Sequence, residues 1–414
     1  MKHPAPVRGR RLGVAALAAL LLASAGPAVL PAAAAGPSAP AAAPAGTRQE
    51  PPLTLLSSDV PAVMDFDKQN PATPSWRLST ADASATATLT HVATGRTVVQ
   101  KLYNDGGLVE MWWEGEFDDG VAAHNGAWTW RLTAKPNNGI GPDVDATGTF
   151  RVQRAAVPHD FDDNGLPDIL GLSESGTFTR HTVIDAATNW QALSGQNTLL
   201  GTGWNVYDRI VPTGDLGGAA HADILTRDRA GVLWLHQGNG TKLDHRVRIG
   251  GGWQVYDQLT SAADLTGDGR TDLVATDKTG ALWLYKGTGK ATAPFGARTR
   301  VGGGWNTYDK IAAVQNLAGA PAGDLVARDR AGVLWLYLGK GDGTFAARTR
   351  IGGGWQDFTQ IIGVGDQDRD GRGDLMAVHK LDGPSLYRGT GAWTKPLAAR
   401  HELLDHYLGS GIFY

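Results

Sequence analysis

The sequence predicts an all-β protein in which a five-bladed β-propeller follows a small β-sandwich. Glycine and tryptophan are abundant, with 56 and 14 copies among 414 residues, and no long apolar stretch has the 3.6-residue period of a helix. A unit of about 50 residues recurs from about residue 157 to the end of the chain, which is the sequence pattern of propeller blades. The segment before it alternates apolar and polar residues, as half-buried strands do.

The first 35 residues have the composition of a cleaved secretory signal. The segment holds no acid and four cations, which are Lys2, Arg8, Arg10 and Arg11. The apolar run at residues 12–25 is shorter than the ~20 residues that a membrane-spanning helix needs, so we expect a secreted, extracellular protein. The sequence does not decide between Sec and twin-arginine export. Residues 36–54 are rich in Ala and Pro and are predicted to be a linker.

The next hundred residues, 55–155, are predicted to form the β-sandwich. Residues 86–91 and 128–132 alternate as strands, and Asn104-Asp-Gly-Gly107 supplies a hairpin turn. The alternative is two further blades, which would give seven. The segment lacks the Trp-to-Asp spacing of the later repeats, which favours the sandwich.

The repeats at 156–414 share a fixed frame. Four tryptophans, Trp204, Trp253, Trp305 and Trp355, recur at spacings of 49, 52 and 50 residues. Two acidic or amide positions follow each of them, 11 and 19 residues later, and an earlier copy shows the same pair at Asp160 and Asp168. We expect these four tryptophans to pack between neighbouring repeats. The third repeat illustrates the four strands predicted for each unit, at residues 257–262, 272–276, 281–285 and 298–301. We expect the ring to close by pairing an early strand with the C-terminal region.

Acidic loops are the clearest chemical signal in the repeats. Three of them place side-chain oxygens at positions 1, 3, 5 and 9 with Gly at position 6, a pattern that can wrap Ca²⁺. The predicted ligands are Asp160, Asp162, Asn164 and Asp168 in the first loop, Asp264, Thr266, Asp268 and Asp272 in the third, and Asp366, Asp368, Asp370 and Asp374 in the fifth. The alternative is a set of hydrogen-bonded turns without metal. The loops of the second and fourth repeats, at 215–223 and 316–324, lack the middle acids and are predicted to be plain turns.

These loops resemble a known family. The pattern Asp-x-Asp-x-Asp-Gly-x-x-Asp-Leu, best preserved at 366–375 and 160–169, resembles the calcium loop of FG-GAP/VCBS repeats, which build propellers in integrin α-subunits and in exported bacterial proteins. The resemblance covers about residues 157–414 and implies calcium as the bound ion. The Gly-Gly-Trp-x-x-Tyr/Phe elements also resemble tachylectin-type five-bladed lectins.

The front segment resembles a different family. Trp112-Trp113-Glu114-Gly115 and residues 125–130 are similar to the Ig-like module of flagellar hook-capping proteins. That family usually has Trp-Asp-Gly and Asp-Gly-Thr-Tyr at these places, so the match is partial. The resemblance implies an Ig-like fold for residues 55–155.

A second set of aromatic residues is predicted to bind a ligand. Trp234, Trp283 and Trp335 hold one equivalent position in three successive units, and Tyr285 and Tyr337 follow two of them at a spacing of two. Aromatic faces suit sugars, and a repeated site would add multivalency. Packing between repeats is the alternative role for these residues.

We therefore expect a non-enzymatic, calcium-binding monomer that binds extracellular or cell-wall glycans. Without the four N-terminal cations, the formal charge of the chain changes from −3 to −7, which argues against nucleic acid or an anionic membrane as partner. The chain has no cysteine, nucleophile elbow or phosphate-binding loop. A protein-binding adhesion propeller and an enzyme whose site is assembled from distant residues are the alternatives.

Overall fold

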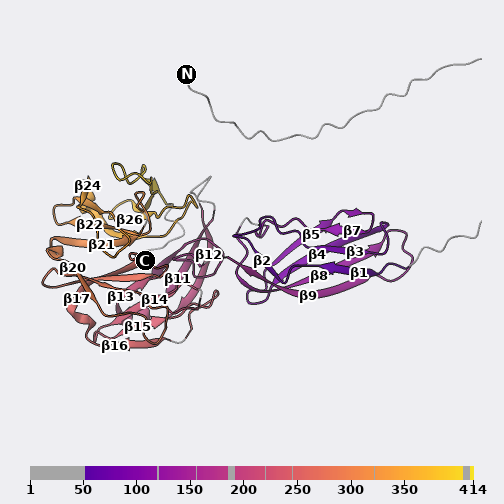
Figure 1. Cartoon of the computed structure of the whole chain (residues 1–414), viewed down its shortest axis with the longest axis horizontal. Coiled ribbons are helices and arrows are strands. Elements are labelled where there is room, and N and C mark those ends of the chain that lie inside the picture. Colours follow the sequence, from indigo (N-terminus) through magenta and orange to yellow (C-terminus); the bar gives the residue numbers. More distant parts are fainter. Residues whose placement is uncertain are drawn as a thin grey trace, which may run out of the picture. The chain divides into compact units, whose positions relative to one another are not determined.

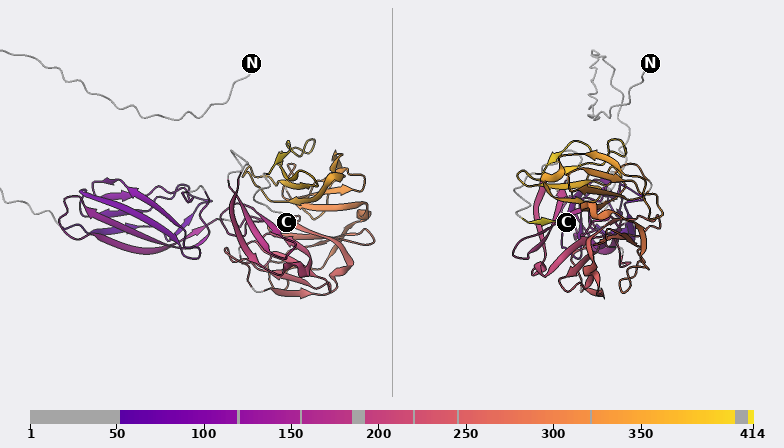
Figure 2. Two further views of the ribbon diagram at one scale, coloured as in Figure 1. Left: turned by 180° about the vertical axis from the view of Figure 1, so that it is seen from behind. Right: turned by 90° about the vertical axis from the view of Figure 1, so that its left-hand side faces the viewer.

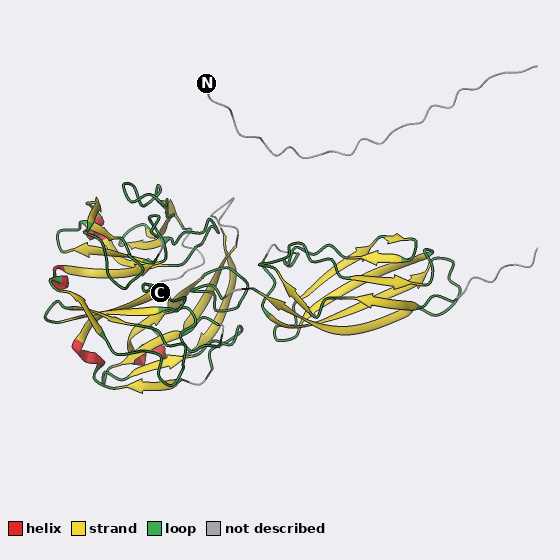
Figure 3. Cartoon of the chain, in the orientation of Figure 1, coloured by secondary structure: helices red, strands yellow, loops and turns green. Residues whose placement is uncertain are grey.

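The computed structural model describes residues 52–118, 121–154, 156–184, 192–219, 221–244, 246–320, 322–403 and 411–414. The predicted signal segment at 1–35 and nearly all of the predicted linker lie outside these ranges. The described chain is all-β, with helix only in four short 3₁₀ turns (Figure 1, Figure 3). None of its helices has the length and apolar character needed to cross a membrane.

The front segment folds into two sheets around one apolar core. The first sheet has the order β1-β3-β7-β6 and the second β2-β9-β8-β4-β5. The bounds of these strands are β1 Leu55–Asp59, β2 Val63–Asp65, β3 Ser75–Leu78, β4 Ala83–His91, β5 Thr97–Leu102, β6 Asn104–Asp105, β7 Leu108–Glu110, β8 Gly126–Pro136 and β9 Val144–Gln153.

Alternation along the strands explains how the two front sheets pack. In β4 and β8 every second side chain is buried, so each strand gives one face to the core and the other to solvent. Trp76 from the first sheet and Trp130 from the second meet edge to face in that core, with ring centroids 5.6 Å apart. The predicted strands at 86–91 and 128–132 fall inside β4 and β8, and the predicted hairpin turn at 104–107 joins β6 to β7.

The repeats form five further sheets of four strands each among the described residues. Their orders are β12-β11-β10-β29, β13-β14-β15-β16, β17-β18-β19-β20, β21-β22-β23-β24 and β25-β26-β27-β28, so four of the five contain consecutive antiparallel strands. The bounds are β10 Asp168–Leu172, β11 Phe178–Ile184, β12 Ala192–Gly201, β13 Tyr207–Pro212, β14 Ile224–Asp228, β15 Leu233–His236, β16 Val247–Gly250, β17 Tyr256–Ala263, β18 Asp272–Asp277, β19 Leu282–Tyr285, β20 Thr299–Gly302, β21 Tyr308–Val314, β22 Asp324–Asp329, β23 Leu334–Tyr337, β24 Thr349–Gly352, β25 Phe358–Gly363, β26 Leu375–His379, β27 Gly383–Tyr387, β28 His401–Glu402 and β29 Ile412–Phe413.

The third repeat follows its sequence-based prediction closely. Its four strands, β17 to β20, begin and end within two residues of the four predicted ranges. Short apolar runs bounded by Gly and Asp turns set these limits, because the turn residues cannot continue a ladder.

The two ends of the repeat region meet in one sheet. The C-terminal strand β29 pairs antiparallel with β10, with Gly171 opposite Phe413 and Leu172 opposite Ile412. The C-terminal end lies among the sheets of the repeats in all three views (Figure 1, Figure 2). The expected pairing of an early strand with the C-terminal region is thus confirmed, and the strand that makes it is Ile412–Phe413.

The tryptophan that opens each unit sits in a 3₁₀ turn and is buried. These turns are η1 Trp204–Val206, η2 Trp253–Val255, η3 Trp305–Thr307 and η4 Trp355–Asp357. Each turn follows a glycine at positive φ, such as Gly252 at 92°. A residue with a side chain would be strained in this backbone conformation. Trp253 shares an apolar cluster with Leu225 of the preceding sheet and Leu273 of its own. The prediction that these tryptophans pack between repeats is confirmed.

Candidate functional site

The acidic loops lie immediately before the second strand of a repeat, or before β10 in the first. The structure brings three carboxylates together in two of them. Asp160, Asp162 and Asp168 in the first loop, and Asp366, Asp368 and Asp374 in the fifth, each place one oxygen within 4.8 Å of the others. The remaining predicted ligand of the first loop, Asn164, is fully buried, whereas the remaining one of the fifth loop, Asp370, is exposed.

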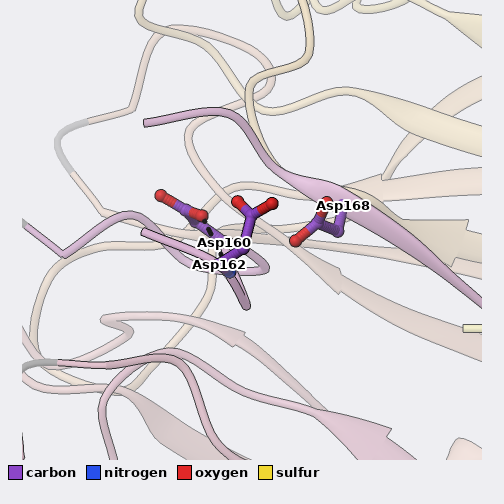
Figure 4. Close-up of side chains that lie close together, drawn as sticks. All are labelled: Asp160, Asp162 and Asp168. Carbon is purple, nitrogen blue, oxygen red and sulfur yellow. Dashed lines mark hydrogen bonds between the residues drawn. The ribbon is translucent and has the colours of Figure 1, made fainter. Parts of the chain in front are cut away.

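The first loop is wrapped around its own carboxylates. Figure 4 shows the three side chains close together, with Asp160 and Asp162 on the loop and Asp168 at the start of β10. The carboxylate of Asp160 accepts hydrogen bonds from the backbone N–H of Asn164 at 3.1 Å and of Gly165 at 2.7 Å. Burial, and then the neighbouring carboxylates of Asp162 and Asp168, raise the pKa of Asp160 well above its usual value.

A cation of the protein already faces the first loop. The guanidinium of Arg180, on β11, lies 2.8 Å from an oxygen of Asp162 and 3.6 Å from one of Asp168. The Nδ1 atom of His124, from the front segment, lies 2.9 Å from the backbone carbonyl of Asp162. Nothing in the spacing of the loop predicted either partner, because Arg180 comes from β11 and His124 from the connection between β7 and β8. Arg180 offsets part of the negative charge that a divalent ion would neutralise.

The fifth loop has the same fold and fewer internal cations. The carboxylate of Asp366 accepts from the backbone N–H of Gly371 at 2.8 Å and of Asp370 at 3.1 Å. Burial raises the pKa of Asp374 to about 8, and the nearby Asp368 adds to the rise. Arg372 contacts Asp370 at 2.8 Å, outside the group of three, and the half-exposed Arg388 lies 3.5 Å from Asp368, within it. Closely spaced carboxylates of this kind fit Ca²⁺, which prefers oxygen ligands.

The predicted ligands of the third loop are less concentrated. Asp264 accepts backbone hydrogen bonds from Thr266, Gly267 and Gly269, as its counterparts do. Among the described residues, Asp264, Asp268 and Asp272 do not form a group of three with ligand atoms within 4.8 Å. Asp268 is exposed and lies 3.6 Å from its neighbour Arg270.

The aspartate at position 9 has a structural role that the sequence analysis missed. In the fourth loop, which lacks the middle acids, Asp324 accepts from the backbone N–H groups of Leu317, Ala318 and Gly339. Asp272 and Asp374 make the corresponding bonds in the third and fifth repeats. This aspartate therefore recurs at the same spacing because it hydrogen-bonds its own loop to the strand connection 15 residues later. The hydrogen bonds do not require an ion.

The predicted ligand-binding tryptophans form a threefold repeated arrangement. Trp234, Trp283 and Trp335 are half-buried, while the leucines on either side of each are buried. The indole N–H of each donates to an aspartate at the end of the preceding strand, at 3.0 Å to Asp228, 2.8 Å to Asp277 and 2.9 Å to Asp329.

An exposed arginine covers one face of each of these rings. The guanidinium carbons of Arg246, Arg298 and Arg348 lie 4.1, 4.1 and 4.0 Å from the ring centroids of Trp234, Trp283 and Trp335. Each arginine also donates to the hydroxyl of a tyrosine, Tyr207, Tyr256 or Tyr308. Each of these arginines lies seven residues before the next opening tryptophan, Trp253, Trp305 or Trp355, and this constant spacing was visible in the sequence and could have identified them.

Tyr285 and Tyr337, the other predicted ligand-binding residues, face the opening tryptophan of their repeat. Their ring centroids lie 4.9 Å from Trp253 and 4.6 Å from Trp305, and their hydroxyls bond those of Tyr256 and Tyr308 at 2.6 Å. Burial first, and then the bonded tyrosine, raise the pKa of each of these two hydroxyls. His236 takes the same place in the second repeat, 4.8 Å from Trp204.

No protein-family model matches the chain, and no curated protein matches it. Among solved structures, the BP39L lectin from Burkholderia pseudomallei matches with 13% identity and a TM-score of 0.37, covering 78% of this chain and 98% of the lectin. AofleA from Arthrobotrys oligospora matches with 11% identity and a TM-score of 0.35, covering 69% and 85%. At TM-scores this low, the function has to be argued from the site itself.

Proposed function

We propose that this chain is a β-propeller of five blades that binds extracellular glycans through a site repeated in three blades. The five four-stranded sheets are the proposed blades, and the two front sheets are proposed to be an Ig-like module. The observation that carries the proposal is the Trp–Arg–Asp arrangement that recurs at Trp234, Trp283 and Trp335.

The chemistry of this arrangement suits a sugar. The aspartate fixes the edge of the indole ring, so the ring is held in place before any ligand arrives, which lowers the entropy cost of binding. The arginine above the ring is exposed and uses one nitrogen on a tyrosine hydroxyl, which leaves further N–H donors for sugar hydroxyls. The exposed part of the indole offers an apolar surface for sugar C–H groups.

Three equivalent sites favour an immobilised or polymeric ligand. Weak binding at one site becomes stronger when linked sites engage the same polysaccharide. The basic, apolar and small-residue order of residues 1–35 supports export, which would place the protein beside such polymers.

We also propose that calcium braces the fifth loop. Asp366, Asp368 and Asp374 would hold the ion, whose charge would offset their mutual repulsion. The first and third loops remain predicted sites, and Arg180 makes the first the weaker candidate for full occupancy.

A glycan array with purified protein tests the glycan proposal, run in calcium and again with chelator. The Trp234→Ala, Trp283→Ala and Trp335→Ala triple variant should lose the array signal, while each single variant should weaken it roughly tenfold or more by loss of avidity. Trp393→Ala is the matched control, because Trp393 is an exposed loop tryptophan outside the repeated arrangement. An unaltered array pattern in a folded triple variant would refute the proposal.

A further inference from the structure

A pocket in the third repeat takes the place that a buried arginine fills in the repeats on either side. The cavity has a volume of about 510 Å³ and is lined by Asp257, Thr276, Trp305 and Tyr308, among others. It lies beside the first strands β13, β17 and β21 of three successive sheets.

In the second repeat, Arg227 on β14 fills the corresponding position. Its Nε and Nη2 atoms donate to both oxygens of Asp208, at 2.9 and 2.7 Å. Its Nη1 atom donates to the backbone carbonyls of Trp253 at 2.9 Å and Tyr256 at 2.7 Å, which belong to the next repeat. One guanidinium thus satisfies a carboxylate and two carbonyls.

The fourth repeat repeats this arrangement with Arg328. The guanidinium donates to both oxygens of Asp309, at 2.9 and 2.6 Å, and to the carbonyls of Trp355 and Phe358 of the next repeat. Both arginine side chains are nearly inaccessible to solvent. The fifth repeat has neither partner, since Thr359 and Val378 replace the acid and the base.

The third repeat alone keeps the acid and lacks the arginine. Asp257 holds the position of Asp208 and Asp309, whereas the buried Thr276 holds that of Arg227 and Arg328. Among the described residues no side chain forms an ion pair with Asp257. The carbonyl of Trp305 accepts the backbone N–H of Tyr308, and that of Tyr308 accepts a 3.2 Å bond from the amide of Gln258. Each carbonyl retains a second lone pair.

We propose that this pocket binds the guanidinium group of an arginine ligand, with Asp257 and the carbonyls of Trp305 and Tyr308 as its acceptors. Arg227 and Arg328 show that this backbone geometry holds a guanidinium when the chain supplies one. A shorter side chain at Thr276 leaves the space open, and the exposed Asp257 gives it access from solvent.

Cations near the pocket narrow the choice of ligand. Arg209, Lys310 and Arg330 also line it. The other three acids of the lining are already engaged: Asp208 and Asp309 pair with buried arginines, and Asp277 accepts the indole N–H of Trp283. An isolated cation would be opposed by the three cationic groups. We therefore infer that the ligand carries a carboxylate as well, as free arginine or a C-terminal arginine residue does.

Calorimetric titration of the full chain with L-arginine tests the proposal. We expect saturable binding that weakens roughly tenfold or more in Asp257→Asn, since a bond to a charged group is lost. Agmatine, which lacks the carboxylate, and L-lysine, which lacks the planar fork, should both bind more weakly than L-arginine.

Thr276→Arg supplies an intramolecular competitor. This variant should fill the pocket with its own guanidinium, abolish L-arginine binding and raise the melting temperature. Thr276→Val, which preserves size without adding charge, should bind as the original chain does. Absence of saturable L-arginine binding, equal binding by Asp257→Asn, or tighter binding of agmatine would each overturn the proposal.

Discussion

The carboxylate of Asp277 accepts a 2.8 Å hydrogen bond from the indole nitrogen of Trp283, across the turn that joins β18 to β19. The same carboxylate also accepts from the backbone N–H groups of Thr279 and Ala281, so it closes the turn and orients the ring together. The fold of the hairpin and the proposed sugar site therefore depend on one side chain.

Replacing Asp277 by Ala should weaken both properties. We expect the free energy of unfolding to fall by about 1–2 kcal/mol at neutral pH, since several hydrogen bonds lose their acceptor. Glycan binding at this repeat should weaken as well, because the ring is no longer held. Denaturant unfolding gives the first quantity, and Lys278→Ala, at an exposed neighbouring position, should change it by less than about 0.5 kcal/mol.

The same variant should alter the acid response. The hydroxyl of Thr279, with help from Trp283 and the backbone of the turn, lowers the pKa of Asp277 from 3.8 to about 2 against the opposing effect of burial. A lowered carboxyl pKa contributes stability above about 3.8 that is lost as the pH falls through about 2. Asp277→Ala should therefore lose less stability over this acid range than the original chain, and an identical acid profile would contradict this assignment.

Calcium removal should destabilise the repeats. Excess EDTA should lower the melting temperature. Added Ca²⁺ should restore it, because binding raises the free energy of unfolding by RT ln(1 + [Ca²⁺]/Kd). Asp368→Asn in the fifth loop should reduce that calcium-dependent part, whereas Asp342→Asn, in an exposed turn of the fourth repeat, should leave it unchanged. A melting curve that is the same with and without EDTA would rule out the brace.

The second repeat should accept a tyrosine at position 236, as its neighbours have at the equivalent position, only if Thr226 is replaced as well. His236 and Thr226 occupy the positions of Tyr285 and Ala275, and the imidazole Nε2 lies 3.1 Å from the hydroxyl of Thr226. His236→Tyr alone should be destabilised by crowding against Thr226. The double variant with Thr226→Ala should be at least as stable as the original chain, because the tyrosine can then pack on Trp204 as Tyr285 packs on Trp253.

The stability of that double variant should also depend less on pH than that of the original chain. Burial first, and then the nearby Arg246, lower the pKa of His236 from 6.5 to about 4. The stability that the neutral imidazole contributes is present above about 6.5 and is lost as the pH falls toward 4. Thermal unfolding between these values should show a smaller decrease for the double variant than for the original chain.

Removal of residues 411–414 should open the sheet that joins the two ends of the repeat region. Phe413 is buried with Ile169, Val364 and Met376, so the deletion removes core contacts and exposes the edge of β10. We expect a lower melting temperature and self-association by light scattering. Phe413→Leu, which keeps the strand and most of the apolar contact, should stay monodisperse, and an undisturbed truncated protein would argue against this closure.

The sequence by itself determined the repeat frame and its strands. Trp253, the Gly and Asp turns and the short apolar runs between them are local signals, so β17 to β20 could be predicted within two residues. The oxygen-rich loops were also local, and the structure does bring three carboxylates together in the first and fifth.

Only the tertiary structure decided which partners these local elements meet. Arg180 reaches the first loop from another strand, Arg298 covers Trp283 from across a hairpin, and Thr276 leaves open a space that Arg227 and Arg328 close elsewhere. Local pattern fixes where a chain turns and which face is apolar, because those preferences act between near neighbours. Pairing between distant side chains depends on how the sheets pack, which no spacing along one strand encodes.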